Sequence, residues 1–582
     1  MTEPGGRIGG SAAATFLSAD RRDALVAAFV GVAVFLLYCD VRILDPREIS
    51  WVLSGDPGQQ FLGWQFFRNT SWLQFPLGAN PTCGTEQPSS IVYTDSLPLL
   101  AFAFKAVRGV LPDPFQYQGL WILSCFVLQP LFAWRLLGRF TDDRTQRLLG
   151  AALFALAPPM LWRLHGHYAL LAHWMIVAAL AEVFESRHRP KAWALLLGIS
   201  ALTHAYLLAM VAAIGCADLV QRVRCRERTR RQAVFESSAA VAGLILLLWV
   251  VGYFLTPRIA GGSYGYFRMN LLAPIDPEEI WSRILPDQPA AGKGDYEGFN
   301  YLGLASWGLL FACSLRLLGR DRPRLDPRRY APLIGLGVGF ALFAVSHRVA
   351  FGAHELFSIP IGDRIEQKLG ILRSSGRIFW PIVYLLYLGG MVWVWRLFRR
   401  RTAVVLTVSL LALQCVDQSA SMAWFRQNFD RTLAPKPAAL ASAFWEEAAG
   451  RYRRIVFVTP TVDLAGAERV LYFAATRDLP VNVAYTSRTD LRRHERTQAA
   501  IERALRAGRV DGETLYVFVD RDALWRELRR KSGRSDLVAV VDGYSLLAPG
   551  MGRFVLGRQD RERTGRRMWT RPRGGGSRPG SE

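Results

Sequence analysis

Cysteine is scarce in this chain, and its placement excludes a disulfide framework. The 582 residues include seven cysteines. Five lie in apolar runs, one lies among arginines and one lies in a long polar segment: Cys39, Cys125, Cys216, Cys313 and Cys415, then Cys225, then Cys83. No disulfide pattern, metal-ligand spacing or catalytic Cys/His pair follows from these positions.

Acidic residues and phosphate-binding loops are also in short supply. The chain has 48 Asp and Glu against 71 Lys and Arg, which gives a net charge of +23. No Gly-rich loop of the G-x-G-x-x-G or Walker type occurs in the C-terminal region. The arginines cluster in short segments between apolar runs, which is typical of cytoplasmic loops and not of a nucleic-acid groove. We therefore expect no nucleic-acid partner.

Apolar residues, in contrast, are abundant. They make up 51% of the chain, and the mean hydropathy is +0.14. This composition indicates a polytopic membrane protein with a soluble appendage. Residues 1–20, rich in Gly, Ala and Ser, are predicted to be a disordered cytoplasmic N-terminus, and Ala24–Leu44 is too long for a signal-peptide core.

Long apolar runs predict about eleven transmembrane helices within residues 21–418. Placing every Arg-rich short loop in the cytoplasm puts the N-terminus inside and the C-terminal region outside. The run Ser96–Leu111 contains Lys105 and Arg108 and is predicted to lie in the interface or against the bundle. The predicted spans are Ala24–Leu44, Gln118–Leu137, Leu148–Trp162, Ala169–Glu185, two short helices within Trp193–Val220 that meet near His204, Ala233–Leu255, Leu302–Leu318, Tyr330–Ser346, Trp380–Leu397 and Val404–Val416.

The pattern changes beyond about residue 435. Short apolar runs alternate with helical stretches, which predicts a small α/β domain with a largely parallel sheet over residues 435–558, on the extracytoplasmic side. The predicted strands are Ile455–Thr459, Val481–Tyr485, Leu515–Val519 and Leu537–Val541. The basic tail, residues 559–582, is predicted to be disordered.

Several polar residues fall on the predicted outer face. They are Asp56 in the outer loop 45–116, Asp95, the group His165, His167 and His173, His204, and the pair Arg373 and Arg377. The two arginines are spaced i, i+4, so one helical face would present both guanidiniums to a phosphate. A carboxylate beside bound phosphate suits transfer of a sugar from a polyprenyl phosphate, with Asp56 as general base.

Structural roles are open for each of these residues. Asp56-Pro57-Gly58 is also a suitable start for a helix, with Asp56 as N-cap. Asp95 could cap the interfacial helix or assist Asp56, and capping is favoured. The histidines could bind zinc, but hydrogen bonding near the interface is favoured because no Cys or Glu completes a tetrahedron. The arginines could be interfacial anchors.

Five motifs carry a resemblance to known proteins. SGDPGQQFLGWQFFRN, FPLGANP, SSIVYTDSLPLL, LTHAYLLAMV and RSSGRIFWP resemble an uncharacterised bacterial multi-pass family, a domain of unknown function grouped with the GT-C glycosyltransferases, over roughly residues 24–545. The resemblance implies a GT-C-like fold, a polyprenyl-phosphate sugar donor and inverting transfer, with Asp56 as the acid of the first outer loop. Many GT-C enzymes carry paired acids there. Because Asp56 stands alone, a divalent cation is not supported.

The sequence therefore predicts a glycosyltransferase of the bacterial inner membrane. Asp56 would be catalytic, and Arg373, Arg377, His204, His165, His167 and Asp95 would bind substrate, with no metal site. The partners would be the lipid-linked donor, membrane lipid and an unidentified extracytoplasmic acceptor. The alternatives are a non-catalytic scaffold or a transporter component of envelope polysaccharide machinery, although no inverted repeat supports a transporter.

Overall fold

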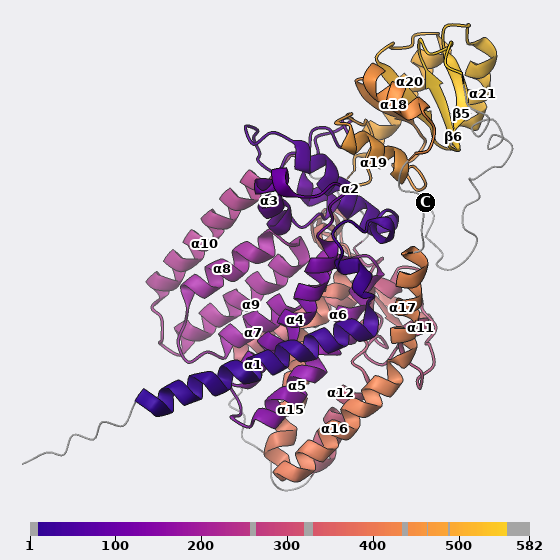
Figure 1. Cartoon of the computed structure of the whole chain (residues 1–582). Coiled ribbons are helices and arrows are strands. Elements are labelled where there is room, and N and C mark those ends of the chain that lie inside the picture. The colour runs from indigo at the N-terminus through magenta and orange to yellow at the C-terminus, as the bar shows by residue number, and fades with distance from the viewer. Residues whose placement is uncertain are drawn as a thin grey trace, which may run out of the picture.

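The computed structural model describes residues 10–255, 264–318, 330–433, 440–462, 464–486 and 489–555. Within these ranges the chain is mainly helical and ends in a small domain that contains a sheet (Figure 1). This coarse fold prediction is confirmed. The helices of the first part are α1 (Gly10–Tyr38), α2 (Gly55–Asn69), α3 (Pro98–Ala106), α4 (Gln118–Leu137), α5 (Arg144–Ala155), α6 (Pro158–Leu161), α7 (Trp174–Val183), α8 (Pro190–Ala201), α9 (Ala205–Arg224), α10 (Arg230–Val251), α11 (Glu278–Trp281), α12 (Leu304–Leu317), α13 (Ala331–Val345), α14 (Asp363–Leu369), α15 (Trp380–Leu397), α16 (Arg400–Asp417) and α17 (Ser419–Thr432).

Several of these helices are long and apolar enough to cross a membrane. Among the described residues there are four: α4, α9, α10 and the stretch Ser375–Leu397 that ends with α15. Two bent pairs raise the number to six if each pair is one span. These pairs are α5 with Pro158–His165, bent by 40°, and α16 with α17, bent by 44°. The protein therefore has the helices of a membrane protein, but the predicted total of about eleven spans is not confirmed.

Two local predictions agree with the structure. The run Trp193–Val220 is broken where expected, because α8 ends at Ala201 and the His204 side chain caps α9 by accepting the Tyr206 N–H at 3.2 Å. The helix α3 is nine residues long and packs near the end of α2. Its Lys105 donates to Thr70 Oγ1 at 2.6 Å, a cation placed at the negative end of the α2 dipole.

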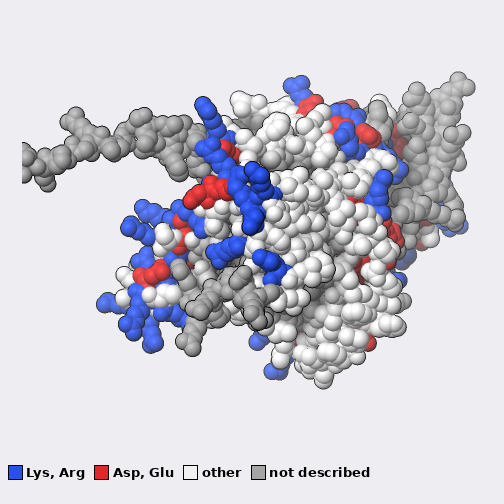
Figure 2. All heavy atoms as spheres, turned by 90° about the horizontal axis from the view of Figure 1, so that it is seen from below, with Lys and Arg blue, Asp and Glu red and all other residues white. Residues whose placement is uncertain are grey.

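The two ends of the chain are described only in part. Helix α1 begins at Gly10, inside the segment 1–20 that was predicted to be disordered, and ends at Tyr38. The predicted tail, residues 559–582, lies outside the described residues. Figure 2 shows Lys and Arg most densely at the left of the face that is seen from below, a smaller charged group at the upper right, and a broad uncharged surface between them.

The C-terminal domain contains a mixed sheet, so the prediction of a largely parallel one is wrong. Its strand order is β3-β4-β6-β5; β3 pairs with β4 in parallel, and the β4–β6 and β6–β5 pairs are antiparallel. The predicted strand Val481–Tyr485 forms isolated bridges at Val481 alone. The elements are α18 (Phe444–Arg451), β3 (Arg454–Val458), α19 (Glu468–Thr476), α20 (Leu491–Arg506), β4 (Thr514–Phe518), α21 (Asp522–Lys531), β5 (Leu537–Val541) and β6 (Tyr544–Ala548).

The C-terminal domain docks against the first long loop of the helical part, next to α2 (Figure 1). Val481 bridges Ile455 on one side and Cys83 on the other, so the loop extends the edge of the sheet. The Thr85 N–H donates to the Val481 carbonyl at 2.8 Å, and the Val481 N–H donates to the Thr82 carbonyl at 2.9 Å. These backbone bonds join chain segments that are about four hundred residues apart.

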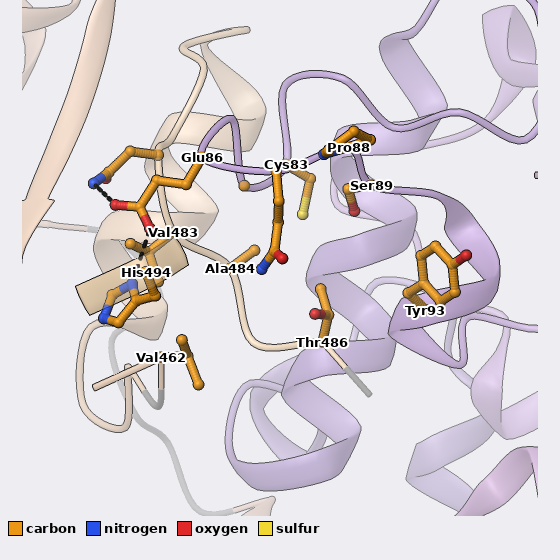
Figure 3. Close-up of a pocket in the computed structure, with 13 residues that line it drawn as sticks. Cys83, Glu86, Pro88, Ser89, Tyr93, Val462, Val483, Ala484, Thr486 and His494 are labelled. Carbon is orange, nitrogen blue, oxygen red and sulfur yellow. Dashed lines mark hydrogen bonds and ion pairs between the residues drawn. The ribbon is translucent and has the colours of Figure 1, made fainter. Parts of the chain in front are cut away.

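A buried carboxylate strengthens this contact. Glu86 accepts hydrogen bonds from His494 Nδ1 at 2.8 Å, Gln498 Nε2 at 2.7 Å and Asn482 Nδ2 at 3.0 Å. Figure 3 shows Glu86 reaching from the loop toward His494, beside a pocket between the two parts. A buried carboxylate needs this many donors to offset its lost hydration.

Candidate active site

Asp56 lies in the first turn of α2 and is not the cap of that helix. Ser54 occupies the N-cap position, and the helix starts at Gly55, so the N-cap interpretation of Asp56 is wrong. A carboxylate in the first turn is stabilised by the positive end of the helix dipole. The Asp56 side chain is 38% exposed, and its Oδ2 lies 3.7 Å from His167 Nε2. The carboxylate is therefore accessible from solvent.

Gly166 brings His167 close to Asp56. Its φ of +117° is in the left-handed region, and a Cβ there would lie 2.9 Å from Pro57 Cδ and 3.5 Å from Asp56 Cβ. A side chain at this position would therefore push the loop away from α2. Gln60 fixes the loop by donating to the Gly166 carbonyl at 2.8 Å.

Glu297, in the 3-10 turn Asp295–Gly298, connects His167 to two arginines. Its Oε1 lies 3.2 Å from His167 Nε2, while its Oε2 accepts from Arg163 Nη1 at 3.0 Å and from Arg377 Nη2 at 2.7 Å. Burial favours the neutral carboxyl, but the two guanidiniums outweigh it and hold the pKa of Glu297 well below its ordinary value. The Nε and Nη2 atoms of Arg163 have no hydrogen-bond partner among the described residues. Two guanidiniums on one carboxylate leave an excess of positive charge.

Asp95 and His204 form a second pair beside Asp56. His204 Nε2 lies 3.8 Å from Asp95 Oδ1, and the Asp95 side chain is 32% exposed. Burial lowers the pKa of His204 to about 3, so its imidazole is neutral at physiological pH. The predicted capping of α3 by Asp95 is wrong, since the N-cap residue of that helix is Leu97 and no side chain caps it.

The electrostatics of Asp95 link the predicted residues to one another. The pKa of Asp95 is raised to about 6, mainly by burial and in part by the Asp56 carboxylate. His167, Arg377 and Arg373 act in the opposite direction. These interactions require proximity, so four separate chain segments deliver these side chains to one place.

The two arginines do not share a helical face, which corrects the i, i+4 expectation. Arg373 follows the 3-10 turn Gly370–Leu372, Ser374 has φ −82° and ψ 71°, and Arg377 lies in the next turn, Ser375–Phe379. Arg377 is buried against the Tyr206 ring, 5.1 Å from its centroid, and is paired with Glu297. Arg373 is exposed and lies 5.8 Å from the centroid of the Phe267 ring. Within the described residues, Arg373 has no salt bridge.

Two of the predicted histidines point elsewhere. His165 Nδ1 donates to the Trp162 carbonyl at 2.8 Å, and its ring packs 4.8 Å from that of Trp424. His173 is buried, 2.8 Å from the Tyr384 hydroxyl and 4.1 Å from the Trp380 ring. Among the described residues, no group of three or more His, Cys, Asp or Glu can hold a metal ion.

A pocket in front of Asp56 is shared between the two parts of the protein. One wall is α2 and its neighbours, and the other is the C-terminal domain. The lining residues include Asp56, Gln59, Phe66 and Thr94 on the first wall, and Leu464, Glu468, Leu471 and Tyr485 on the second. The C-terminal domain therefore forms the second wall of the pocket that contains the Asp56 carboxylate.

A family model described as Domain of unknown function (DUF6311) matches residues 28–419. A second model, the DUF6311 C-terminal domain, matches residues 444–549. The chain belongs to this family. No curated protein matches it. The resemblance to a domain of unknown function is thus confirmed, and the grouping of DUF6311 with GT-C glycosyltransferases stays a prediction.

Two residues of this DUF6311 site were missed from the sequence. Arg163 follows an apolar run on the predicted outer face, where the positive-inside distribution of arginine does not explain a cation. That unexplained position was the signal from which a functional role could have been predicted. Glu297 lies in a long loop among aromatic residues, and nothing in its local pattern indicates that it pairs with Arg163 and Arg377.

Proposed function

We propose that the protein is an inverting glycosyltransferase that moves a sugar from a polyprenyl phosphate to an extracytoplasmic acceptor. The observation that supports this most is the accessible Asp56 carboxylate beside His167, close to Asp95 and the arginines. A base and a cluster of cations next to apolar helices are what transfer from a lipid phosphate requires. A binding scaffold has no need for a partly exposed carboxylate at this position.

In the proposed reaction, Asp56 takes the proton of the acceptor hydroxyl. The acceptor oxygen forms a bond to the anomeric carbon, and the bond from that carbon to the phosphate oxygen breaks. The electron pair leaves with polyprenyl phosphate, so atoms and charge balance. Attack opposite to the leaving group inverts the anomeric configuration.

Arg373 is the proposed contact of the leaving phosphate. It is exposed and near Asp95, and its planar fork suits two phosphate oxygens. Arg377 is already paired with Glu297 and has a positioning role, since Glu297 in turn contacts His167. Asp95 is the second candidate base, because its raised pKa of about 6 is closer to the pH at which a general base is effective.

This proposal requires the site to face away from the cytoplasm. Alkaline-phosphatase fusions test that orientation: a fusion after Thr229 should be inactive and one after Pro435 active, because the Arg-rich segment 222–231 is expected inside. The reverse pattern would place Asp56 on the cytoplasmic side and remove the basis of the proposal.

Membranes that contain the wild-type chain or Asp56→Asn should be assayed with a panel of labelled polyprenyl-phosphate sugars. We expect the variant to insert normally and to lose roughly two to four orders of magnitude in transfer rate, the usual contribution of a general base. Asp522→Asn is the matched control, since Asp522 is also an exposed acid in the first turn of a helix. Normal transfer by Asp56→Asn would favour Asp95 as base, to be tested with Asp95→Asn, and wild-type transfer no greater than in membranes that lack the chain would favour the scaffold.

A further inference from the structure

The strands β1 (Arg348–Phe351) and β2 (His354–Ser358), together with α14 and the turn after it, expose an unusual number of large apolar side chains. We refer to these residues as the apolar patch. Each is 50% to 55% exposed: Phe351, Leu356, Phe357, Ile359, Ile365 and Ile371. Contiguous exposed apolar surface on a folded protein marks a contact with another apolar surface.

The exposed aromatic residues of the hairpin share one face. Val349 pairs with Phe357, so Phe351, two residues after Val349, lies on the same side of the ribbon as Phe357. Leu356 has no partner residue on β1, because the register shifts between Val349 and Ala350, and it is 55% exposed. An apolar layer against which the ribbon lies flat covers this face.

The patch continues an apolar stripe on α13. Ile334, Val338 and Leu342 follow one another at intervals of four residues, and they are 53%, 57% and 70% exposed. The helix ends at Val345, and β1 starts at Arg348. The 15 residues of α13 rise about 22 Å, short of the roughly 30 Å hydrocarbon core of a bilayer. Because the hairpin starts three residues after the helix ends, it lies next to the level at which the apolar stripe stops.

Polar groups limit how deeply the hairpin can enter. The sheet has two strands, and the far edge of β2 is not paired with a further strand of the described chain. Unpaired backbone groups are costly in hydrocarbon, so the ribbon belongs at the level of the headgroups. Helix α14 carries Arg364 and Lys368 together with Asp363 and Glu366, and such a mixture of charges lies in the hydrated headgroup layer and not in hydrocarbon.

We propose that the apolar patch lies in the interfacial layer of the bilayer, on the side where α13 ends, with a lipid surface as its partner. The patch anchors the segment that leads to Arg373 at the depth of lipid phosphates. This inference requires membrane insertion of α13 and is independent of glycosyl transfer.

Depth-dependent fluorescence quenching tests the proposal. The exposed Cys216, Cys225 and Cys415 are first replaced by Ser, and an environment-sensitive dye is attached to Leu356→Cys or to Phe357→Cys. The labelled protein is placed in nanodiscs of phosphatidylcholine and phosphatidylglycerol, with nitroxide lipids that quench near the headgroup or near the chain ends. Val338→Cys, at the middle of α13 and 57% exposed, reports the membrane core, and Leu491→Cys, 58% exposed on the C-terminal domain, reports water.

We expect the headgroup-proximal nitroxide to quench both hairpin positions at least about two-fold more than Leu491→Cys, as for an interfacial segment. The chain-end nitroxide should quench them less than Val338→Cys. Quenching equal to that at Leu491→Cys at either hairpin position would overturn the proposal, and so would quenching as deep as at Val338→Cys. Ile359→Cys replaces either hairpin variant that does not assemble, with the same two criteria.

Discussion

The protein contains two clusters of acidic and basic side chains, and they differ in how completely their carboxylates are paired with guanidiniums. Near the end of α7, Glu182 and Glu185 are 6% and 9% exposed. Glu182 contacts Arg135 and Arg189, and Glu185 contacts these two and Arg139. In the candidate active site, Asp56 and Asp95 are 38% and 32% exposed, and neither has a guanidinium within salt-bridge distance in the described chain.

This difference separates a structural role from a chemical one. Carboxylates that are buried among guanidiniums hold helices together, and removing one leaves an uncompensated charge. A carboxylate that is accessible and incompletely paired can accept a proton. Glu297 combines the two situations, because it is as buried as Glu182 and also contacts His167 beside Asp56.

The largest effect is expected from removing a buried carboxylate. Glu297→Gln should lower the free energy of unfolding by about 3–5 kcal/mol, because Arg163 and Arg377 lose the carboxylate that pairs them. Glu182→Gln should lower it less, because Arg135 and Arg189 still contact Glu185. Thermal unfolding in detergent measures this. Per folded molecule, Glu297→Gln should also reduce transfer because His167 is released, whereas Glu182→Gln should not. If both variants lose transfer equally, the two clusters do not differ in their role in transfer.

A smaller effect is expected at Arg373. Arg373→Lys keeps the charge and loses the fork, so the KM for the lipid-linked donor should rise about ten-fold, the value of one charge-assisted hydrogen bond. Arg364→Lys, an exposed arginine on α14, is the matched control. If the two variants use donor equally well, Arg373 does not contact the phosphate.

The smallest effect is the pH dependence of stability that arises from Asp95. Its pKa in the folded protein is about 6, above the ordinary 3.8, so between these values the folded chain binds a proton that the unfolded chain has lost. The stabilisation is present at low pH and is lost as the pH rises through 6. Asp95→Asn should therefore unfold with a weaker pH dependence between about pH 4 and pH 7, by about 1–2 kcal/mol. A wild-type pH profile in this variant would show that Asp95 is well hydrated.

The sequence predicted the site residues that stand out from their immediate neighbours in the chain. Asp56 and Asp95 are acids in a segment between apolar runs, and His204 interrupts one, so all three stood out from the sequence. Glu297 could not be found this way, because its role comes from pairing with Arg163 and Arg377 across the fold. The prediction that Arg373 and Arg377 share a helical face was wrong because Ser374, between them, does not have helical backbone angles.

The sheet was partly predictable, and one available signal was overlooked. Asp542 and Gly543 have φ of 49° and 88°, the left-handed pair of a tight hairpin turn, and they join β5 to β6. An Asp-Gly pair between apolar runs is a strong hairpin signal, so the antiparallel half of the sheet could have been predicted. The bridge from Val481 to Cys83 could not, because it depends on a segment about four hundred residues away.

The edge formed by residues 82–86 also bears on how the protein is made. These residues are synthesised long before β3 and α20, so water is the partner of the loop's backbone groups and of Glu86 until Val481, His494 and Gln498 emerge. If the two segments reach the same side of the membrane, the last domain adds the second wall of the Asp56 pocket as it folds. The completed pocket is then a product of the final step of biogenesis, and a chain that stops before Val481 would not complete it.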